Sequence, residues 1–224
     1  MLPRFHFKST VLGHAFSVWR LLTAKRDCSV LYLSYSDSMA RYHISEINKA
    51  VTRNPVLSEL LTNRSPKADF SFRYYTGNKR PVEVAHGGLF SFKRGMHVNG
   101  ALIADDIVRD PENPLNIGQV LKVEEHFLTE SMFIPLKGVP VIVLGTPMMP
   151  GDILTKLQED DRFKSRVLPA LDPVPNRRVL MPELYSEKWL LQQQKARPQS
   201  FASEFMLIPH FATEAYFHEE DIVK

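Results

Sequence analysis

Residues 100–108, GALIADDIV, decide the fold that this sequence predicts. An apolar run follows a glycine and ends in two acids, Asp105 and Asp106, a pattern typical of a strand buried on both faces. Residues 29–35 (SVLYLSY) and 138–147 (GVPVIVLGTP) have the same character. Because strands buried on both faces belong to parallel sheets, the three runs together predict a mostly parallel sheet that is covered by helices.

Helical patterns alternate with these strands. Residues 11–22 carry apolar side chains at helical spacing, which predicts one buried face made of Val11, Leu12, Ala15, Phe16, Trp19 and Leu22. A second helix follows Ser36 or Asp37, either of which can cap it, and extends to about Arg53. Further helices are predicted over residues 116–133, 151–160 and 186–196. Strand and helix therefore alternate, and we predict an α/β protein with helices on both faces of the sheet.

The remaining segments are less regular. Between residues 65 and 100, the aromatic stretches 69–75 (DFSFRYY) and 88–95 (GLFSFKRG) predict antiparallel strands or a hairpin. Beyond residue 171, prolines interrupt the pattern, and an irregular aromatic tail follows the last helix.

The composition narrows the class of protein. The chain has 224 residues, 44% of them hydrophobic, which is enough for one substantial core. Cys28 is the single cysteine, so an internal disulfide and a cysteine-based zinc site are excluded. The net charge of +3 permits contact with nucleic acid without requiring it. The sequence contains no apolar run of membrane-spanning length and no signal-peptide pattern, which predicts a soluble, intracellular protein.

In an open parallel sheet, ligands bind at the carboxyl ends of the strands, so the residues after each strand are considered together. Lys8 and Ser9 begin the first helix, where backbone amides favour phosphate, an ammonium pairs with phosphates and a hydroxyl ligates magnesium. Of the two acids after residue 104, one suits a magnesium shell and the other suits orientation of an attacking water.

Gly145 and Thr146 follow the third strand, where a small residue and a hydroxyl can sense a γ-phosphate. Each of the three sets has an ordinary alternative: a basic helix start, acids that end a strand, and a turn. Their occurrence in this chain order favours a nucleotide site, because hydrolysis needs a phosphate clamp, a metal carboxylate and a water-orienting acid at adjacent strand ends.

These residues resemble a known family, the large subunit of the tailed-phage terminase. PRFHFKST at residues 3–10 is similar to the family's deviant Walker A motif, and GALIADDI resembles its Walker B motif. VIVLGTPMMPGDIL at residues 141–154 resembles the coupling segment that follows, and residues 180–209 are similar to the end of the ATPase domain. The resemblance covers nearly the whole chain and implies a phosphate-loop NTPase of the ASCE, RecA-like type.

The resemblance implies a role for each matching residue. Lys8 would bind the β and γ phosphates, and Ser9 and Asp105 would ligate magnesium. Asp106 would stand in the position of the catalytic acid. Arg4 would stabilise transition-state charge in cis, unless an arginine of a neighbouring subunit does so.

The remaining matches lie in the loop and in the coupling segment. His6 and Thr10 would complete the nucleotide-binding loop, with no catalytic role for His6. Gly145 and Thr146 would transmit hydrolysis to DNA movement.

Three features depart from the family pattern. Phe7 stands where the loop has a glycine before the lysine. The chain begins almost inside the loop, so the family's first strand is missing, which predicts weak stability or reduced activity. It ends about where the family's nuclease domain would begin. We divide it into an ATPase core, residues 1–171, and a connector at the end of the ATPase domain, residues 172–224.

The implied function is an ATP-hydrolysing motor that drives double-stranded DNA into procapsids, with ATP and Mg²⁺ as cofactors. The implied partners are DNA, the portal protein, the terminase small subunit and further copies in a ring, with no membrane contact, in the host cytoplasm at the procapsid. Two alternatives stay open: another DNA-translocating or helicase-like ATPase, and a truncated, non-catalytic fragment that acts in assembly.

Other basic and histidine residues carry weaker signals. Lys93 and Arg94, and also Arg177 and Arg178, could face phosphate or DNA, although solvated turns are as common or commoner. The histidines show no metal-ligand spacing.

Overall fold

A computed structural model describes residues 1–63, 71–92, 95–108 and 117–209. Its centre is a six-stranded sheet with the order β2-β3-β4-β1-β5-β6. The strands are β1 (Cys28–Ser34), β2 (Leu61–Asn63), β3 (Ser71–Thr76), β4 (Pro81–Gly88), β5 (Ala101–Asp105) and β6 (Val141–Leu144). β4, β1, β5 and β6 are parallel neighbours, whereas β3 is antiparallel to both β2 and β4. The predicted α/β class with a mostly parallel sheet is confirmed.

The register aligns the carboxyl ends of the three central apolar strands. Asp105, the last residue of β5, pairs with Ser34 of β1 on one side and with Leu144 of β6 on the other. Residues that follow these strands therefore emerge at one edge of the sheet, as parallel topology requires.

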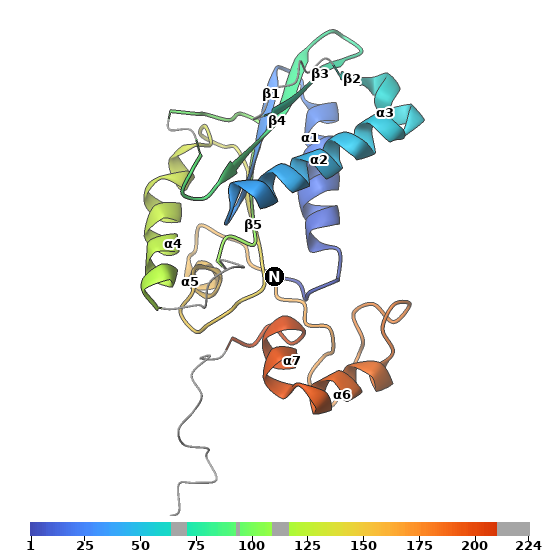
Figure 1. The fold of residues 1–224 in the computed structure, drawn as a ribbon, viewed down its shortest axis with the longest axis vertical. Helices are drawn as coiled ribbons and strands as arrows, with labels where there is room; N and C mark the ends of the chain where they lie inside the picture. The colour runs from blue at the N-terminus through green and yellow to red at the C-terminus, as the bar shows by residue number, and fades with distance from the viewer. Residues whose placement is uncertain (64–70, 93–94, 109–116, 210–224) are drawn as a thin grey trace, which may run out of the picture.

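Helices lie on both faces of the sheet (Figure 1). They are η1 (Ser9–Ala15), α1 (Phe16–Thr23), α2 (Asp37–Arg53), α3 (Pro55–Leu60), α4 (Ile117–Thr129), η2 (Ser131–Phe133), α5 (Ile153–Glu159), α6 (Glu187–Ala196) and α7 (Pro198–Glu204). α1 and α2 pack on one face, where Leu21 and Ile47 join a core with Tyr32 of β1. α4 and α5 pack on the other face, where Phe127 and Ile153 are fully or almost fully buried.

Local sequence signals account for the long second helix. The Ser36 hydroxyl accepts a hydrogen bond from the Met39 amide at 3.3 Å and caps α2, which ends at Arg53 as predicted. Asn54 then caps α3, and Pro55 occupies the first turn of that helix, where its missing N–H costs nothing.

The predicted strand at residues 88–95 is wrong. The strand that pairs with β3 is β4, which ends at Gly88, and Leu89–Phe92 forms a turn. β4 has weak strand signals of its own, since its sequence PVEVAHGG combines charged, proline and glycine residues. The strand is instead stabilised by pairing with β1 on one side and with β3 on the other. Lys93 and Arg94 lie outside the described residues.

The predicted buried face of the first helix is also largely wrong. Val11, Leu12, Ala15 and Trp19 are exposed, and only Phe16 and Leu22 pack against the core. The buried residues are Gly13, Ser17, Val18 and Leu21. Small residues face the sheet because η1 passes very close to Tyr32: a Cβ at Gly13 would lie 2.4 Å from the Tyr32 hydroxyl. On α4, Val123 and Phe127 are buried, whereas Ile117 and Leu121 are exposed.

The C-terminal helices form a small cluster of their own beside the N-terminus (Figure 1). Leu190 of α6 and Phe201 of α7 are buried with Ala170 and Leu171. α6 agrees with the predicted helix over residues 186–196, whereas α7 was not predicted. The division of the chain at residue 171 stays a prediction. No helix in the described part of the chain is long and apolar enough to span a membrane.

Candidate functional site

The stretch from Pro3 to Lys8 forms a tight loop that leads into η1. Phe5 and Phe7 have φ angles of 61° and 56°, a left-handed conformation that favours glycine. Phe7 stands at the position before the lysine, where standard phosphate loops carry glycine. The chain therefore adopts a glycine-like conformation at this position with a phenylalanine, and both phenyl rings are exposed.

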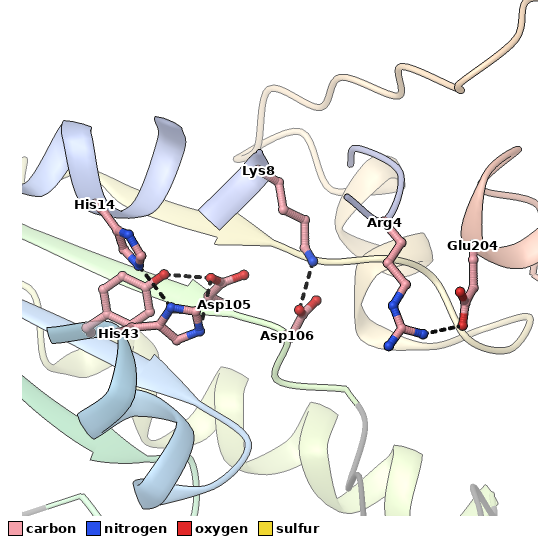
Figure 2. Close-up of polar contacts among 8 residues, drawn as sticks. Arg4, Lys8, His14, His43, Asp105, Asp106 and Glu204 are labelled. Carbon is pink, nitrogen blue, oxygen red and sulfur yellow. Dashed lines mark hydrogen bonds and ion pairs between the residues drawn. The ribbon is translucent and has the colours of Figure 1, made fainter. Parts of the chain in front are cut away.

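Lys8 and Asp106 meet at the edge of the sheet (Figure 2). The Lys8 ammonium donates to Oδ2 of Asp106 at 2.8 Å, and the two residues line the same pocket of about 400 Å³. Arg4, Gly145, Thr146 and Glu204 also line this pocket. Residues from both ends and from the middle of the chain therefore converge on one cavity, as the sequence predicted for Lys8, Asp106, Gly145 and Thr146.

Asp106 is the first residue after β5 and turns back sharply, with a φ of 49°. Its amide donates to the carbonyl of Leu144 at 3.0 Å, which fixes the turn against β6. Its side chain is half exposed (51%) and lines the pocket. Desolvation by the surrounding protein raises the pKa of Asp106, and the charge of Asp105 adds to the rise, while Lys8 opposes it.

Asp105 points the other way, into the protein. It is fully buried, and its Oδ2 accepts a hydrogen bond of 2.6 Å from the Tyr32 hydroxyl. The His43 ring on α2 lies 3.8 Å from the same oxygen, and His14 Nε2 lies 2.9 Å from His43 Nδ1. Asp105 does not line the pocket, so the two adjacent acids face different surroundings (Figure 2).

Burial shifts the pKa values of the side chains around Asp105. Desolvation raises the pKa of Tyr32, and the neighbouring Asp105 carboxylate adds to the effect, so the phenol stays protonated and remains a donor. Desolvation also lowers the pKa of His43, and it lowers that of His14 to about 4 with help from His43. Both imidazoles are therefore neutral at pH 7.

The coupling residues lie where β6 ends. Gly145 directly follows β6 and leaves room for α5, since a Cβ there would lie 2.6 Å from Cδ1 of Leu154. Asp152 caps α5 through the Thr155 amide at 3.0 Å and accepts a further hydrogen bond of 2.8 Å from the Met148 amide. These bonds hold the turn after Thr146 in a fixed shape beside the pocket.

The C-terminal helices hold the loop from its other side. Arg4 forms an ion pair of 2.8 Å with Glu204 of α7 (Figure 2), and the Arg4 amide donates to the Glu204 carbonyl. His6 is buried and stacks on the Tyr185 ring with 4.9 Å between centroids, with the Phe205 ring at its edge. His6 therefore packs within an aromatic group and does not line the pocket.

The other predicted loop residues lie nearby. Ser9 is half-buried at the start of η1 and does not line the pocket. Thr10 is exposed on the outer side of η1. Arg177, in the C-terminal segment, lies 3.8 Å from Glu187 and does not line the pocket. Its contact with DNA stays a prediction.

Sequence reasoning missed Tyr32, His43, His14, Glu204 and Tyr185. Tyr32 carried a usable signal, because a tyrosine inside a run predicted to be buried needs a partner for its hydroxyl. Glu204 and Tyr185 carried none, since their contacts with the loop depend on how the C-terminal helices pack.

The residues fit a magnesium ion that is shared with phosphates. No group of three or more His, Cys, Asp or Glu residues in the described ranges could hold a metal by itself. Magnesium, however, is commonly held by one or two protein oxygens together with substrate phosphates and waters. Oδ1 of Asp105 is buried and has no hydrogen-bond partner, and a buried carboxylate oxygen of this kind favours a cation.

Comparisons with known proteins bear on the fold. No protein-family model and no curated protein matches the sequence. Among solved structures, the large terminase of bacteriophage HK97 matches with a TM-score of 0.60 and 14% identity, over 92% of this chain and 45% of that one. The large terminase ATPase domain of Thermus phage P74-26 matches with a TM-score of 0.58 and 13% identity, over 92% of this chain and 86% of that one.

The chain has the fold of a large-terminase ATPase domain. The fold expected from the sequence resemblance is therefore confirmed. The large terminase of a thermophilic bacteriophage in complex with ADP has the same fold, with a TM-score of 0.59 and 10% identity, over 92% of this chain. This chain spans about half (46%) of that large terminase.

Proposed function

We propose that the chain is the ATP-hydrolysing motor domain of a phage terminase large subunit, which drives double-stranded DNA into procapsids. One observation carries the proposal: Lys8, from the phosphate loop, and Asp106, from the end of β5, meet at 2.8 Å in a pocket at the carboxyl edge of the sheet. The large-terminase fold supports it, as does the large terminase of a thermophilic bacteriophage that was solved in complexes with ATP-gamma-S and with ADP.

In the proposed mechanism, Lys8 releases Asp106 and pairs with the β and γ phosphates, because a triphosphate offers the ammonium more negative charge than one carboxylate. Asp106, freed from the ammonium, accepts a hydrogen bond from the attacking water and aligns it with the γ-phosphate. The raised pKa of Asp106 suits this role, since a more basic carboxylate holds the water's proton better. Catalysis then depends on positioning and on electrostatic stabilisation.

Ser9 and Asp105 would hold magnesium, which supplies positive charge to the phosphate oxygens when bound. Arg4 lines the pocket, but its guanidinium is paired with Glu204. An in-cis role for Arg4 therefore requires that this ion pair opens, whereas an arginine of a neighbouring subunit needs no such change. Gly145 and Thr146, at the pocket wall, would pass the change at the γ-phosphate to α5.

The partners follow from the same proposal. Double-stranded DNA, the portal protein, the small subunit and further copies in a ring are proposed partners, and the host cytoplasm at the procapsid is the proposed location. Fragments that act only in assembly and helicase-like motors remain the alternatives.

Hydrolysis of ATP by the purified chain with Mg²⁺ tests the proposal. We expect hydrolysis that Asp106→Asn lowers at least about 100-fold, because a positioned acid or base contributes roughly that much. Asp161→Asn, which changes an exposed acid outside the pocket, should leave the rate unchanged. Acceleration by double-stranded DNA without strand separation supports a packaging motor, strand separation supports the helicase-like alternative, and absence of both hydrolysis and nucleotide binding contradicts the proposal.

A further inference from the structure

Tyr32 lies at the centre of the buried polar group behind the pocket. Its side chain is fully buried in the middle of β1, and its hydroxyl donates to Oδ2 of Asp105 at 2.6 Å. The Tyr32 ring stacks on His43 with 4.9 Å between centroids, which fixes the direction of the hydroxyl. Tyr32 itself does not line the pocket, so it can act only through its neighbours.

The same hydroxyl also contacts the phosphate-loop helix. Ser9 begins η1, the helix that follows Lys8. Gly13, one turn further along η1, provides the space, because a Cβ there would lie 2.4 Å from the Tyr32 hydroxyl oxygen. One phenol oxygen therefore lies between η1 and the end of β5, close to Gly13 and bonded to Asp105, one of the two predicted magnesium ligands.

The two oxygens of Asp105 differ because of this contact. Oδ2 has Tyr32 as a donor and His43 at 3.8 Å, whereas Oδ1 is buried without a partner. If the carboxylate could rotate freely, either oxygen could take the Tyr32 bond. The stacking on His43, and the His43–His14 contact of 2.9 Å behind it, hold the Tyr32 hydroxyl in the position where it bonds Oδ2.

We propose that Tyr32 is a positioning residue of the magnesium site: its hydroxyl holds Asp105 by Oδ2, so that Oδ1 is the oxygen left without a partner and can accept the ion. The inference rests on the proposed function, because the ion enters with the nucleotide. It assigns no chemistry to Tyr32 beyond orienting Asp105, which is the role that outer partners of metal ligands generally have.

Calorimetric binding of ADP at a series of Mg²⁺ concentrations tests this inference without measuring activity. Mg²⁺ should enhance ADP binding, and we expect Tyr32→Phe to raise the Mg²⁺ concentration that gives half of this enhancement about 10-fold or more. The reason is that loss of an outer partner of a metal ligand typically costs 10- to 100-fold in metal affinity. Binding of ADP in the presence of EDTA should not change, because Lys8 and the loop amides are untouched.

Tyr74→Phe is the matched control. Tyr74 is also fully buried, and its hydroxyl donates to Oδ1 of Asn48 at 3.0 Å, away from the pocket. Both variants therefore lose one buried hydrogen bond, but only Tyr32→Phe should shift the Mg²⁺ dependence. Gly13→Ala gives a second route, because its Cβ displaces the Tyr32 hydroxyl without removing it, and it should produce the same shift.

The outcomes separate this inference from the proposed function. An unchanged Mg²⁺ dependence in folded Tyr32→Phe, or in folded Gly13→Ala where Tyr32→Phe does not fold, overturns the inference alone. Absence of nucleotide binding in the wild-type chain overturns the proposed function and the inference with it. In an Asp105→Asn background, Tyr32→Phe should add no further shift, because the oriented carboxylate is already lost.

Discussion

The Lys8 ammonium lies 2.8 Å from Oδ2 of Asp106, although 98 positions separate the two residues. Lys8 is brought there by η1 and Asp106 by the turn after β5, so the sheet edge alone places them together. The Lys8 side chain is 12% exposed and that of Asp106 is 51% exposed, both within the pocket wall. An anionic ligand in this cavity can compete with Asp106 for the Lys8 ammonium and so open the ion pair.

The ion pair should contribute little to folding. Because the Asp106 side chain is half exposed, we expect a double-mutant cycle of Lys8→Met and Asp106→Asn to give a coupling energy below about 1 kcal/mol in the free energy of unfolding. Urea unfolding of the four proteins measures it. A coupling of several kcal/mol would indicate a structural ion pair and not a ligand site.

Replacing Phe7 by glycine should leave the fold more stable than replacing it by alanine. Its φ of 56° costs a residue with a Cβ about 1–2 kcal/mol, whereas glycine adopts this conformation freely. We therefore expect Phe7→Gly to unfold at a higher urea concentration than Phe7→Ala, by about 1 kcal/mol in free energy. At an ordinary backbone position the order reverses, so a more stable alanine variant would contradict the left-handed loop.

Tyr185 should hold the phosphate loop in place. It stacks on His6, and its hydroxyl donates to the Phe5 carbonyl at 3.4 Å. We expect Tyr185→Ala to lower the free energy of unfolding by about 2 kcal/mol and to speed amide exchange at Arg4, whose N–H bonds α7. Phe133→Ala, at a side chain that is 73% exposed, is the control. Equal exchange at Arg4 in the Tyr185 variant would show that the C-terminal helices do not clamp the loop.

His14 should make the fold sensitive to mild acid. Burial lowers its pKa from 6.5 to about 4, so between these values the unfolded chain binds more protons than the folded chain. The free energy of unfolding therefore falls as the pH decreases from about 6.5 to about 4. We expect His14→Gln to flatten this part of the stability curve and His97→Gln, at an exposed histidine, to leave it unchanged. Equal slopes in the wild type and His14→Gln would contradict the burial of a neutral His14.

The central strands and α2 could be predicted because their signals are local. The first four residues of β5 are all apolar, and Ser36 and Asn54 limit α2 at both ends. β4 could not be predicted in the same way, since its residues reach the sheet through pairing with β1 and β3 and not through their own preferences. Strand pairing between distant segments leaves little trace in a short window of sequence.

The sequence predicted several residues that line the pocket but not the buried residues behind it. Lys8, Asp106, Gly145 and Thr146 follow from the rule that ligands bind at the carboxyl ends of parallel strands. The buried face of the first helix was assigned to its apolar residues, but the close contact with Tyr32 requires the small residues Gly13 and Ser17 there. The opposite directions of Asp105 and Asp106 depend on a sharp turn at Asp106, which neither hydrophobic pattern nor spacing reveals.

The central claim is that Lys8 and Asp106 line a pocket for a nucleoside triphosphate. Equilibrium binding of ATPγS with Mg²⁺ tests it most directly in the wild type, in Lys8→Ala and in Lys122→Ala, which changes an exposed lysine on α4 outside the pocket. We expect binding by the wild type and by Lys122→Ala, and at least about 10-fold weaker binding by Lys8→Ala, because one lost charge-assisted contact to phosphate costs about 1.5–3 kcal/mol. Equal affinity in all three proteins, or no binding by the wild type, would contradict the claim.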